Sequence, residues 1–586
     1  MKIKHILSML AFASVGLMTV TSCNDYLTIY PTDRVTGKDF WKTAGDVQET
    51  MAAAYAQMIS GATEERAIVW STFRSDEVIQ STSYTNNDFE NISAVNLLQT
   101  QNICDWASYY AVINRCNIVL EHAPKVMEID PEFTQGDYEV VRGNMLALRS
   151  LCYFYLVRAF RDVPYTKQAY EDDDEQMVIP QSAPDSVLAF CINDLEEAGH
   201  LVMKSGAYGN GNWRNKGYFT RDAVNALLAD IYLWRGSMTH NVSDYKQCIA
   251  YCDMIIESKD KWFRNNNTDQ VTVGDANDRY HLYAVEDAMR EIFVNGNSRE
   301  SILELQYDGN TNANSTLCNY LYRTSDNSAI SRFMASQIFN EISSDANSSS
   351  SQKMFFSDKD HRYWDNVFEV GNDDYTELNI RKYATITGDN APTSGNGQNF
   401  AQGATRRVAN FTQNWMVYRL TDVMLMKAEA LVQISQEDES ALEQAFNLVQ
   451  VVNKRSMSTR GNAPADTLKI GDFQTQGEME NLVLAERGRE LSFEGKRWFD
   501  LMRYCYRHME GVDITKLMAD QVDWPQLYQP MLSMAARKYT TGGDVFIYKM
   551  KSEPYLYWPI YQHDLKVNKL LKQNPVFKLV ETSVKQ

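Results

Sequence analysis

Three glutamates, Glu486, Glu490 and Glu494, follow one another at four-residue spacing near the C-terminal end of the chain. On a helix this spacing places their carboxylates on one face. Two carboxylates in different environments beside a cleft are the machinery of a glycosidase, which leaves no sequence motif of its own. Carboxylates that alternate with arginines are equally typical of structural ion-pair networks. The pairs expected for such a network are Arg487–Glu490, Glu494–Arg497 and Arg497–Asp500.

The neighbours of these charges favour the structural interpretation. The residues between them are of core type: Leu491, Phe493, Trp498, Phe499 and Leu501. Motifs of other common catalysts are missing, since there is no Walker-type glycine loop, no HExxH and no GxSxG, and the eight histidines are scattered. The residues therefore point to no catalytic residues, metal ligands or cofactor, although a glycosidase stays formally possible because it needs no motif.

A second kind of chemistry is offered by aromatic and amide side chains in polar loops. The sequence has 33 Tyr against 24 Phe and 11 Trp, and an excess of rings with hydroxyls is typical of half-wet surfaces that contact polar ligands. Stretches rich in Asn, Ser, Gly and Asp occupy residues 78–100, 205–219, 264–280, 308–316, 341–352 and 388–406. Long loops on a rigid scaffold carry binding residues in many proteins, although for each loop taken singly a solvated connection is the better explanation.

Helices must position these loops, because apolar residues recur with helical periodicity through most of the chain. The expected helices are 46–60, 101–123, 137–161, 185–200, 220–236, 244–257, 417–434, 438–456 and 478–508. Some follow one another as pairs that resemble tetratricopeptide repeats, although no fixed 34-residue period runs through the sequence. We predict a mostly α fold in which helix pairs support an irregular, loop-rich part.

Charge and cysteine content narrow the possible functions. The chain of 586 residues has a net charge of −19 and no basic stripe, which excludes nucleic acid as a partner and disfavours strongly anionic glycans. Eight cysteines follow Cys23 and lie mostly in apolar helical stretches, where we expect buried thiols. The sequence leaves open whether any of them form disulfides.

The N-terminus reads as an export signal. Lys2 and Lys4 precede an apolar run of about 15 residues, which is shorter than the ~20 residues that span a bilayer. Small residues lead into Cys23, as in a bacterial lipobox, so we predict a signal peptide over 1–22 and fatty acylation, for example with palmitate, of Cys23. The alternative is a signal peptide with a coincidental cysteine. Loss of the two lysines would take the net charge from −19 to −21.

Taken together, several sequence blocks resemble the SusD/RagB family of outer-membrane nutrient-binding lipoproteins from the Bacteroidetes. The blocks are Cys23 to Leu27, Ala147 to Arg158 with Asp162-Val163-Pro164, Tyr418-Arg419-Leu420 with Ala428-Glu429-Ala430, Glu486 to Leu501, and Gln573-Asn574-Pro575. They occur in the family's order over essentially the whole mature chain. Arg161 departs from the pattern, because the family usually has glycine before Asp-Val-Pro.

This resemblance implies a function as well as a fold. Family members lie on the cell surface, cap a SusC-like TonB-dependent barrel, and capture oligosaccharides or, in some branches, peptides for import, without catalysis. We accordingly expect one SusD-like domain over 23–586, with an N-terminal part of about 23–290 and a C-terminal part of about 291–586. The lipid on Cys23 would be its only membrane attachment, at the surface of the outer membrane.

The resemblance also directs the search for the ligand site. In family members the aromatic platform follows an Asp-Glu pair, which here is Asp76-Glu77. The corresponding candidates are Tyr84, Asn86, Asn87 and Phe89, without the tryptophans of a starch-type site. Further candidates from other loops are Tyr208, Asn212, Trp213, Tyr307, Asn310, Tyr320, Tyr322, Tyr363 and Trp364. For each ring, packing against its own loop or against the barrel is the competing explanation.

Three functions therefore stay open at this point. The first is a surface protein that binds oligosaccharides, or peptides in the same role. The second is a lid or assembly subunit with little ligand affinity of its own. The third is a surface hydrolase, which only the formation of shortened products would support.

Overall fold

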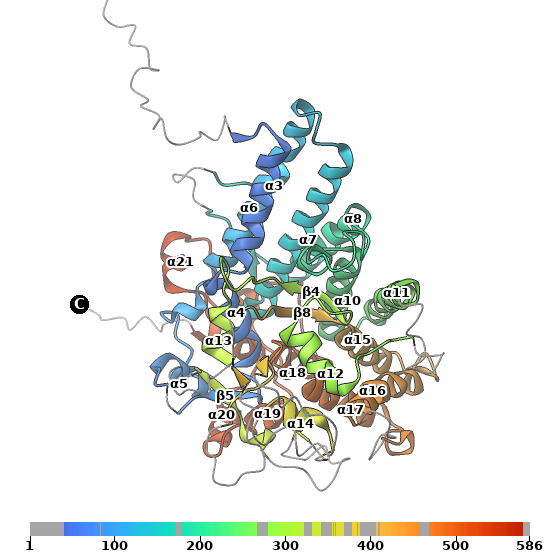
Figure 1. Cartoon of the computed structure of the whole chain (residues 1–586). Helices are drawn as coiled ribbons and strands as arrows, with labels where there is room; N and C mark the ends of the chain where they lie inside the picture. The colour runs from blue at the N-terminus through green and yellow to red at the C-terminus, as the bar shows by residue number, and fades with distance from the viewer. Residues whose placement is uncertain are drawn as a thin grey trace, which may run out of the picture.

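The computed structural model describes residues 40–82, 84–171, 177–266, 279–321, 331–340, 354–355, 357, 359–367, 378–383, 385–386, 406–407, 411–457 and 468–577. Helices dominate this part of the chain, and the prediction of a mostly α fold is confirmed (Figure 1). The likeness to tetratricopeptide repeats stays a prediction. Cys23 and Tyr322 lie outside the described residues.

The N-terminal half is built from long helices that pack on their neighbours in sequence or space. They are α3 (Ala44–Met58), α4 (Gly61–Thr72), α6 (Ala107–Ile129), α7 (Gln135–Phe160), α8 (Pro184–Leu201), α10 (Arg221–Thr239) and α11 (Val242–Asn266). Thr43 and Thr134 begin α3 and α7 with capping boxes, and Pro184 occupies the first turn of α8. Helix α3 packs on α6, α6 on α7, α7 on α8, and α10 on α11.

The long helices of the C-terminal half continue this arrangement. They are α15 (Leu420–Gln433), α16 (Ala441–Met457), α17 (Gln476–Glu490) and α18 (Arg497–Arg507). Helix α15 packs on α11, α16 and α17, so it joins the two halves. Shorter helices in this half and between the long ones are α5 (Asn87–Ser93), α9 (Arg214–Gly217), α12 (Val285–Met289), α13 (Ser315–Leu321), α14 (His361–Asp365), α19 (Gln529–Ala536), α20 (Gly543–Lys549) and α21 (Gln562–Val567).

The strands of the described residues form small antiparallel pairs. Strand β1 (Val78–Gln80) pairs with β5 (Phe333–Ala335), and β4 (Ser301–Leu305) pairs with β8 (Trp415–Arg419). The other pairs are β2 (Val163–Pro164) with β3 (Gln181–Ser182) and β6 (Thr385–Ile386) with β7 (Arg406–Arg407). Each pair ties together segments that are distant in the sequence or closes a loop.

The predicted single helix over 478–508 is wrong, because α17 and α18 are separated by a turn. Within this turn Phe493 has a φ of 63° and Gly495 a φ of 70°, which no helix contains. A Cβ on Gly495 would lie 2.8 Å from the Ser71 hydroxyl and 2.8 Å from the Trp415 ring. Only glycine fits both the backbone angle and the space.

The same turn explains why the expected ion pairs along this segment are wrong. Arg487 pairs with Asp500 and Asp422, and Arg497 pairs with Asp76, which follows α4. Glu490 and Glu494 instead form ion pairs with Arg419, the last residue of β8. The structural interpretation itself is confirmed, since all three glutamates are buried and paired: Glu486, Glu490 and Glu494.

Large side chains fill one continuous core between these elements. The fully buried tryptophans are Trp70, Trp234, Trp415, Trp498 and Trp558. The eight described cysteines are buried and free, which confirms the expectation of buried thiols. None of the described helices is both long and apolar enough to cross a membrane.

Candidate ligand-binding site

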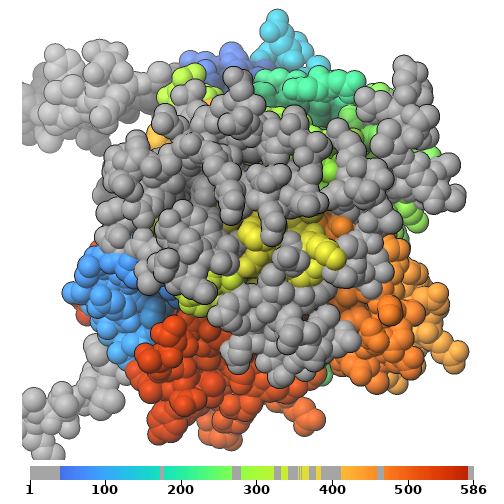
Figure 2. All heavy atoms as spheres, turned by 60° about the horizontal axis from the view of Figure 1, so that its bottom comes forward, coloured from blue at the N-terminus to red at the C-terminus, as the bar shows by residue number. Residues whose placement is uncertain are grey.

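The first group of candidate residues lies where β1 and β5 meet. Pairing of Gln80 with Phe333 brings the segment after β1 beside the segment before β5. Helix α13 packs on α4 at the same place, and Figure 1 shows α5, α13 and β5 grouped at the lower left. Figure 2 shows this face of the molecule, with the segment of α5 in blue beside the segment of α19 and α20 in red. Residues more than 200 positions apart in the sequence therefore meet here.

Arg332 is the centre of this group, which we call the Tyr84 cluster: Glu65, Tyr84, Asn86, Tyr320 and Arg332. The guanidinium of Arg332 lies 4.6 Å from the ring centre of Tyr320 and 5.5 Å from that of Tyr84. It pairs with Glu65 at 3.1 Å, and the Tyr320 hydroxyl donates to the same carboxylate. The Arg332 and Glu65 side chains are 32% and 25% exposed, so both stay in contact with solvent.

The exposed side of the Tyr84 cluster carries amide groups. The Asn86 amide donates to the Tyr84 hydroxyl over 3.3 Å, while its carbonyl accepts from the backbone N–H of Asp88 at 2.8 Å and caps α5. Gln80 donates to the backbone carbonyl of Tyr84 at 2.6 Å. Asn87 is exposed beside them. These contacts hold the Tyr84 ring in place without covering it completely.

Burial first, and then the Glu65 carboxylate, raise the pKa of the Tyr320 hydroxyl. Tyr320 therefore remains a proton donor to Glu65 at any physiological pH. The guanidinium of Arg332 is paired with the Glu65 carboxylate and lies over the rings of Tyr84 and Tyr320. The cluster thus offers a ligand fixed hydrogen-bond donors and acceptors.

Phe89 does not belong to this surface, which corrects the expectation for that residue. It is 5% exposed and packs against Phe73, Phe333 and Tyr320. Its position as the third residue of α5 turns the ring inward, while Asn87 faces solvent. Sequence spacing within the loop did not reveal this helix.

The second group of candidates lies in the loop that contains α9. Trp213 is 44% exposed and packs edge-on against Tyr218, as does the half-buried Tyr208. Asn212 donates to the backbone carbonyl of Tyr208 at 3.1 Å and accepts from the N–H of Arg214 at 3.0 Å. Hydrogen bonds of the Asn212 amide therefore fix the conformation of the loop, and Trp213 is the ring that the loop exposes to solvent.

The remaining candidates are spread over other parts of the fold. The Tyr307 hydroxyl donates to the backbone carbonyl of Ile59, and Asn310 is exposed in a turn closed by Asp308. Tyr363 is 3% exposed and donates to the backbone carbonyl of Asn340. Trp364 is half-buried against it. The expectation that Tyr363 contacts ligand is wrong, because packing and this hydrogen bond occupy it.

Sequence reasoning missed Glu65 and Arg332, although they complete the Tyr84 cluster. Glu65 lies within α4 and Arg332 just before β5, 267 positions later. No motif marks either residue, and only strand pairing reveals that they meet.

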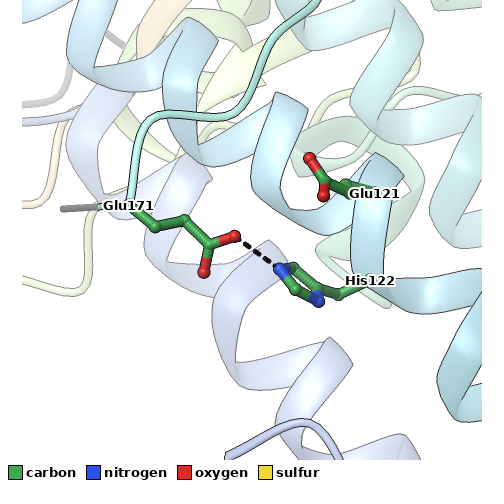
Figure 3. A group of neighbouring side chains, drawn as sticks. All are labelled: Glu121, His122 and Glu171. Carbon is green, nitrogen blue, oxygen red and sulfur yellow. Dashed lines mark hydrogen bonds and ion pairs between the residues drawn. The ribbon is translucent and has the colours of Figure 1, made fainter. Parts of the chain in front are cut away.

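One group of described residues has the geometry to hold a metal ion: Glu121, His122 and Glu171, whose ligand atoms lie within 4.8 Å of one another. Figure 3 shows Glu121 and His122 on α6, with Glu171 reaching His122 from a loop. His122 is 2.7 Å from Glu171 and stacks on Trp41 at 4.7 Å. Both glutamates are exposed. Ion pairing and stacking account for this arrangement, and the expected absence of a metal stays a prediction.

Two family sequence models and several known proteins match this chain. A sequence model of the SusD family matches residues 297–577, and a model described as starch-binding and associating with the outer membrane matches residues 32–233. SusD-like protein P38 of Formosa agariphila is 23% identical over 91% of this chain and 97% of its own length. SusD-like protein P2 of the same organism is 22% identical over 83% of this chain and 89% of its own.

Solved structures agree with these matches at the level of the fold. Bacteroides fragilis NanU superimposes with a TM-score of 0.62 and 17% identity, and the match covers 94% of this chain and 100% of the NanU chain. A SusD superfamily protein of Bacteroides thetaiotaomicron gives 0.58 and 20% over 92% of this chain and 99% of its own. The described helical architecture is thus the fold of the SusD superfamily structures. The chain belongs to the SusD/RagB family, whose members are binding proteins rather than enzymes.

Proposed function

We propose that this protein is a lipid-anchored protein of the outer-membrane surface that captures oligosaccharides and delivers them to a SusC-like TonB-dependent transporter. Family membership supports the nutrient-binding role, and the description of the N-terminal family match supports the membrane and the glycan. The observation that carries the proposal is the Tyr84 cluster. It combines rings, an amide and a guanidinium on one partly exposed surface.

These groups match the chemistry of sugars. A sugar ring has an apolar CH face, which stacks on aromatic rings, and hydroxyls, which need fixed donors and acceptors. Arg332 fixes both tyrosine rings before any ligand arrives, so little conformational entropy is lost on binding. Asn86, Asn87 and Gln80 supply amides at the rim.

A binding experiment tests the site. We expect affinity gel electrophoresis of the purified protein with a panel of neutral polysaccharides to show retention by at least one of them. Tyr84→Ala removes the ring and the partner of Asn86, so we expect affinity to fall about tenfold, equivalent to about 1.4 kcal/mol. Tyr548→Ala is the matched control, because Tyr548 is 71% exposed on α20 and, among the described rings and cations, contacts Lys551 alone. Equal retention of all three proteins would contradict the site.

Two alternatives make different predictions. For a peptide-binding protein, a peptide pool would bind while every polysaccharide fails. For a lid with little ligand affinity, cells without the protein would lose ligand uptake, whereas cells with a Tyr84→Ala/Trp213→Ala variant would take up ligand normally.

A further inference from the structure

A separate pocket lies between the loop that contains α9 and the C-terminal half of α11. It has a volume of about 100 Å³, which is room for several water molecules or one small chemical group. None of its lining residues belongs to the Tyr84 cluster. The charged members of its lining are Lys216, Asp222, Lys259 and Arg299.

Two lysines point at the same atom in this pocket. The ammonium groups of Lys216 and Lys259 each donate to the backbone carbonyl of Ser301 over 2.6 Å, and Lys259 also donates to the carbonyl of Arg299 at 2.9 Å. Within the described part of the chain neither lysine has a carboxylate at ion-pair distance. Two like charges that share one neutral acceptor repel each other, and a buried cation without a counter-charge is costly.

Arg299 adds a third positive charge. Its guanidinium stacks on Tyr283 at 3.9 Å and donates to the carbonyl of Leu282, while its Nε is buried without a hydrogen-bond partner among the described residues. Asp222 is the single carboxylate of the described lining, and it accepts from Ser258 at 3.1 Å. Three cations therefore face one anion, and the lining has a positive excess.

An aromatic ring and amides complete the pocket. Trp262 and Asn212 both line it. Gly206, with a φ of 82°, lets the loop approach the indole so closely that a Cβ there would lie 2.9 Å from the ring. The ring provides a flat apolar wall, and the amide provides a donor and an acceptor. A cation pair beside a ring and an amide has the character of a site for a charged sugar rather than for a simple ion.

We infer that this pocket binds the negatively charged group of an acidic sugar, such as the carboxylate of a uronic acid, with its ring against Trp262. The sugar half of this inference rests on the proposed function, whereas the anion half rests on the lysine pair. An anionic oxygen between Lys216 and Lys259 would replace their repulsion by two charge-assisted hydrogen bonds. The negative net charge of the whole chain does not prevent this, because salt screens charges beyond about 10 Å.

The electrostatics of Lys259 support this inference. Burial first, and then the ammonium of Lys216, lower the pKa of Lys259 well below its usual range. The carboxylates of Asp222 and Glu300 act in the opposite direction, but no described carboxylate lies at ion-pair distance from the Lys259 ammonium. A bound carboxylate at hydrogen-bond distance would stabilise both ammonium groups.

Calorimetric titration of the purified full chain with sodium glucuronate, glucose and sodium acetate tests the inference. We expect glucuronate to bind at least tenfold more tightly than glucose, and acetate to bind more weakly than glucuronate. Lys216→Gln and Lys259→Gln each remove one charge but keep a donor, so each is expected to weaken glucuronate binding at least tenfold. Lys261→Gln is the matched control, because Lys261 is exposed on the same helix and paired with Glu257.

The outcomes separate the two halves of the inference. Equal affinity for glucose and glucuronate, or full affinity in both lysine variants, would overturn the anion site. Acetate binding as tight as glucuronate binding would overturn the sugar half. Binding of glucuronate without retention of any neutral polysaccharide would support the pocket and count against the Tyr84 cluster, so the two sites fail independently.

Trp262→Ala should weaken the binding of glucuronate but leave the binding of acetate unchanged, and this pattern excludes general unfolding.

Discussion

At the scale of single residues, environment separates side chains that the sequence presents as equals. Tyr84 and Tyr363 are both tyrosines of polar segments, yet Tyr84 is half-exposed beside Arg332 and Tyr363 is 3% exposed with its hydroxyl bonded to Asn340. Glu64 and its neighbour Glu65 differ in the same way. Glu65 reaches solvent at 25% exposure, whereas Glu64 is 1% exposed. Identity of the side chain therefore does not determine its role.

Glu64 gives a prediction about pH. Burial raises its pKa from 4.5 to about 7, although hydrogen bonds from Tyr307 and Asn314 act in the opposite direction. Between these two values the folded protein holds a proton that the unfolded chain has lost, so the free energy of unfolding falls as pH rises. The loss is about 3 kcal/mol, because each pKa unit corresponds to about 1.4 kcal/mol. Glu64→Gln should abolish it.

Urea denaturation at pH 5 and pH 8 checks this prediction. We expect Glu64→Gln to gain stability relative to the wild-type protein at pH 8 and to gain little at pH 5. Glu49→Gln is the control, because Glu49 is exposed on α3 and contacts water in both states. The prediction is wrong if the difference between Glu64→Gln and the wild-type protein is the same at both pH values.

At the scale of elements, short irregular segments decide how the long helices are placed. The turn between α17 and α18 lets Arg497 reach Asp76 at 2.8 Å, a contact that a straight helix would not make. Arg161 ends α7 with a φ of 66°, where the family usually has glycine. Its side chain donates to Glu553 at 2.8 Å and to the carbonyl of Asp513 at 2.6 Å, which offsets the backbone strain.

Gly495 gives a prediction at this scale. Gly495→Ala places a methyl group 2.8 Å from Ser71 and Trp415 at a φ of 70°, so we expect a loss of about 2 kcal/mol or more in the free energy of unfolding. Gly477→Ala is the matched control, because nothing lies within 4 Å of that position and it is the second residue of α17. Alanine is favoured over glycine inside helices, so the control should be neutral or slightly stabilising. Equal stability of the two variants in denaturant titrations would show that the turn tolerates a side chain.

At the scale of the whole molecule, contacts across the chain support our proposal of one domain over 23–586. Strand β1 pairs with β5, and Arg74 donates to the backbone carbonyl of Leu556 at 2.8 Å. Both contacts join the N-terminal part to the C-terminal part. A body held together in this way could move as a unit on a lipid tether at Cys23, which remains part of the proposal together with the transporter partner.

The tether gives the last prediction. Cells fed an alkyne-tagged palmitate should label the wild-type protein, and the label should disappear in Cys23→Ser because a serine hydroxyl replaces the acylated thiol. The variant should also leave the outer-membrane fraction, since the lipid on Cys23 is the membrane attachment that we propose. The other eight cysteines stay in place and serve as an internal control. Label that persists in Cys23→Ser would refute acylation at this residue.

The sequence by itself determined the helical class, most of the long helices and the family, because periodicity, caps and ordered blocks are local properties of the chain. Its element boundaries were good where the pattern was uninterrupted, as in α7 and α8. It was wrong for 478–508, where a positive φ at Gly495 depends on the space left by Trp415 and Ser71.

Only the tertiary structure decided which candidates form a site. It joined Tyr84 and Asn86 with Tyr320, placed Phe89 and Tyr363 in the interior, and added Glu65 and Arg332. It also brought Lys216 and Lys259 to one carbonyl oxygen from two helices. Such meetings depend on strand pairing and helix packing over tens to hundreds of residues, and neither composition nor spacing along the chain records them.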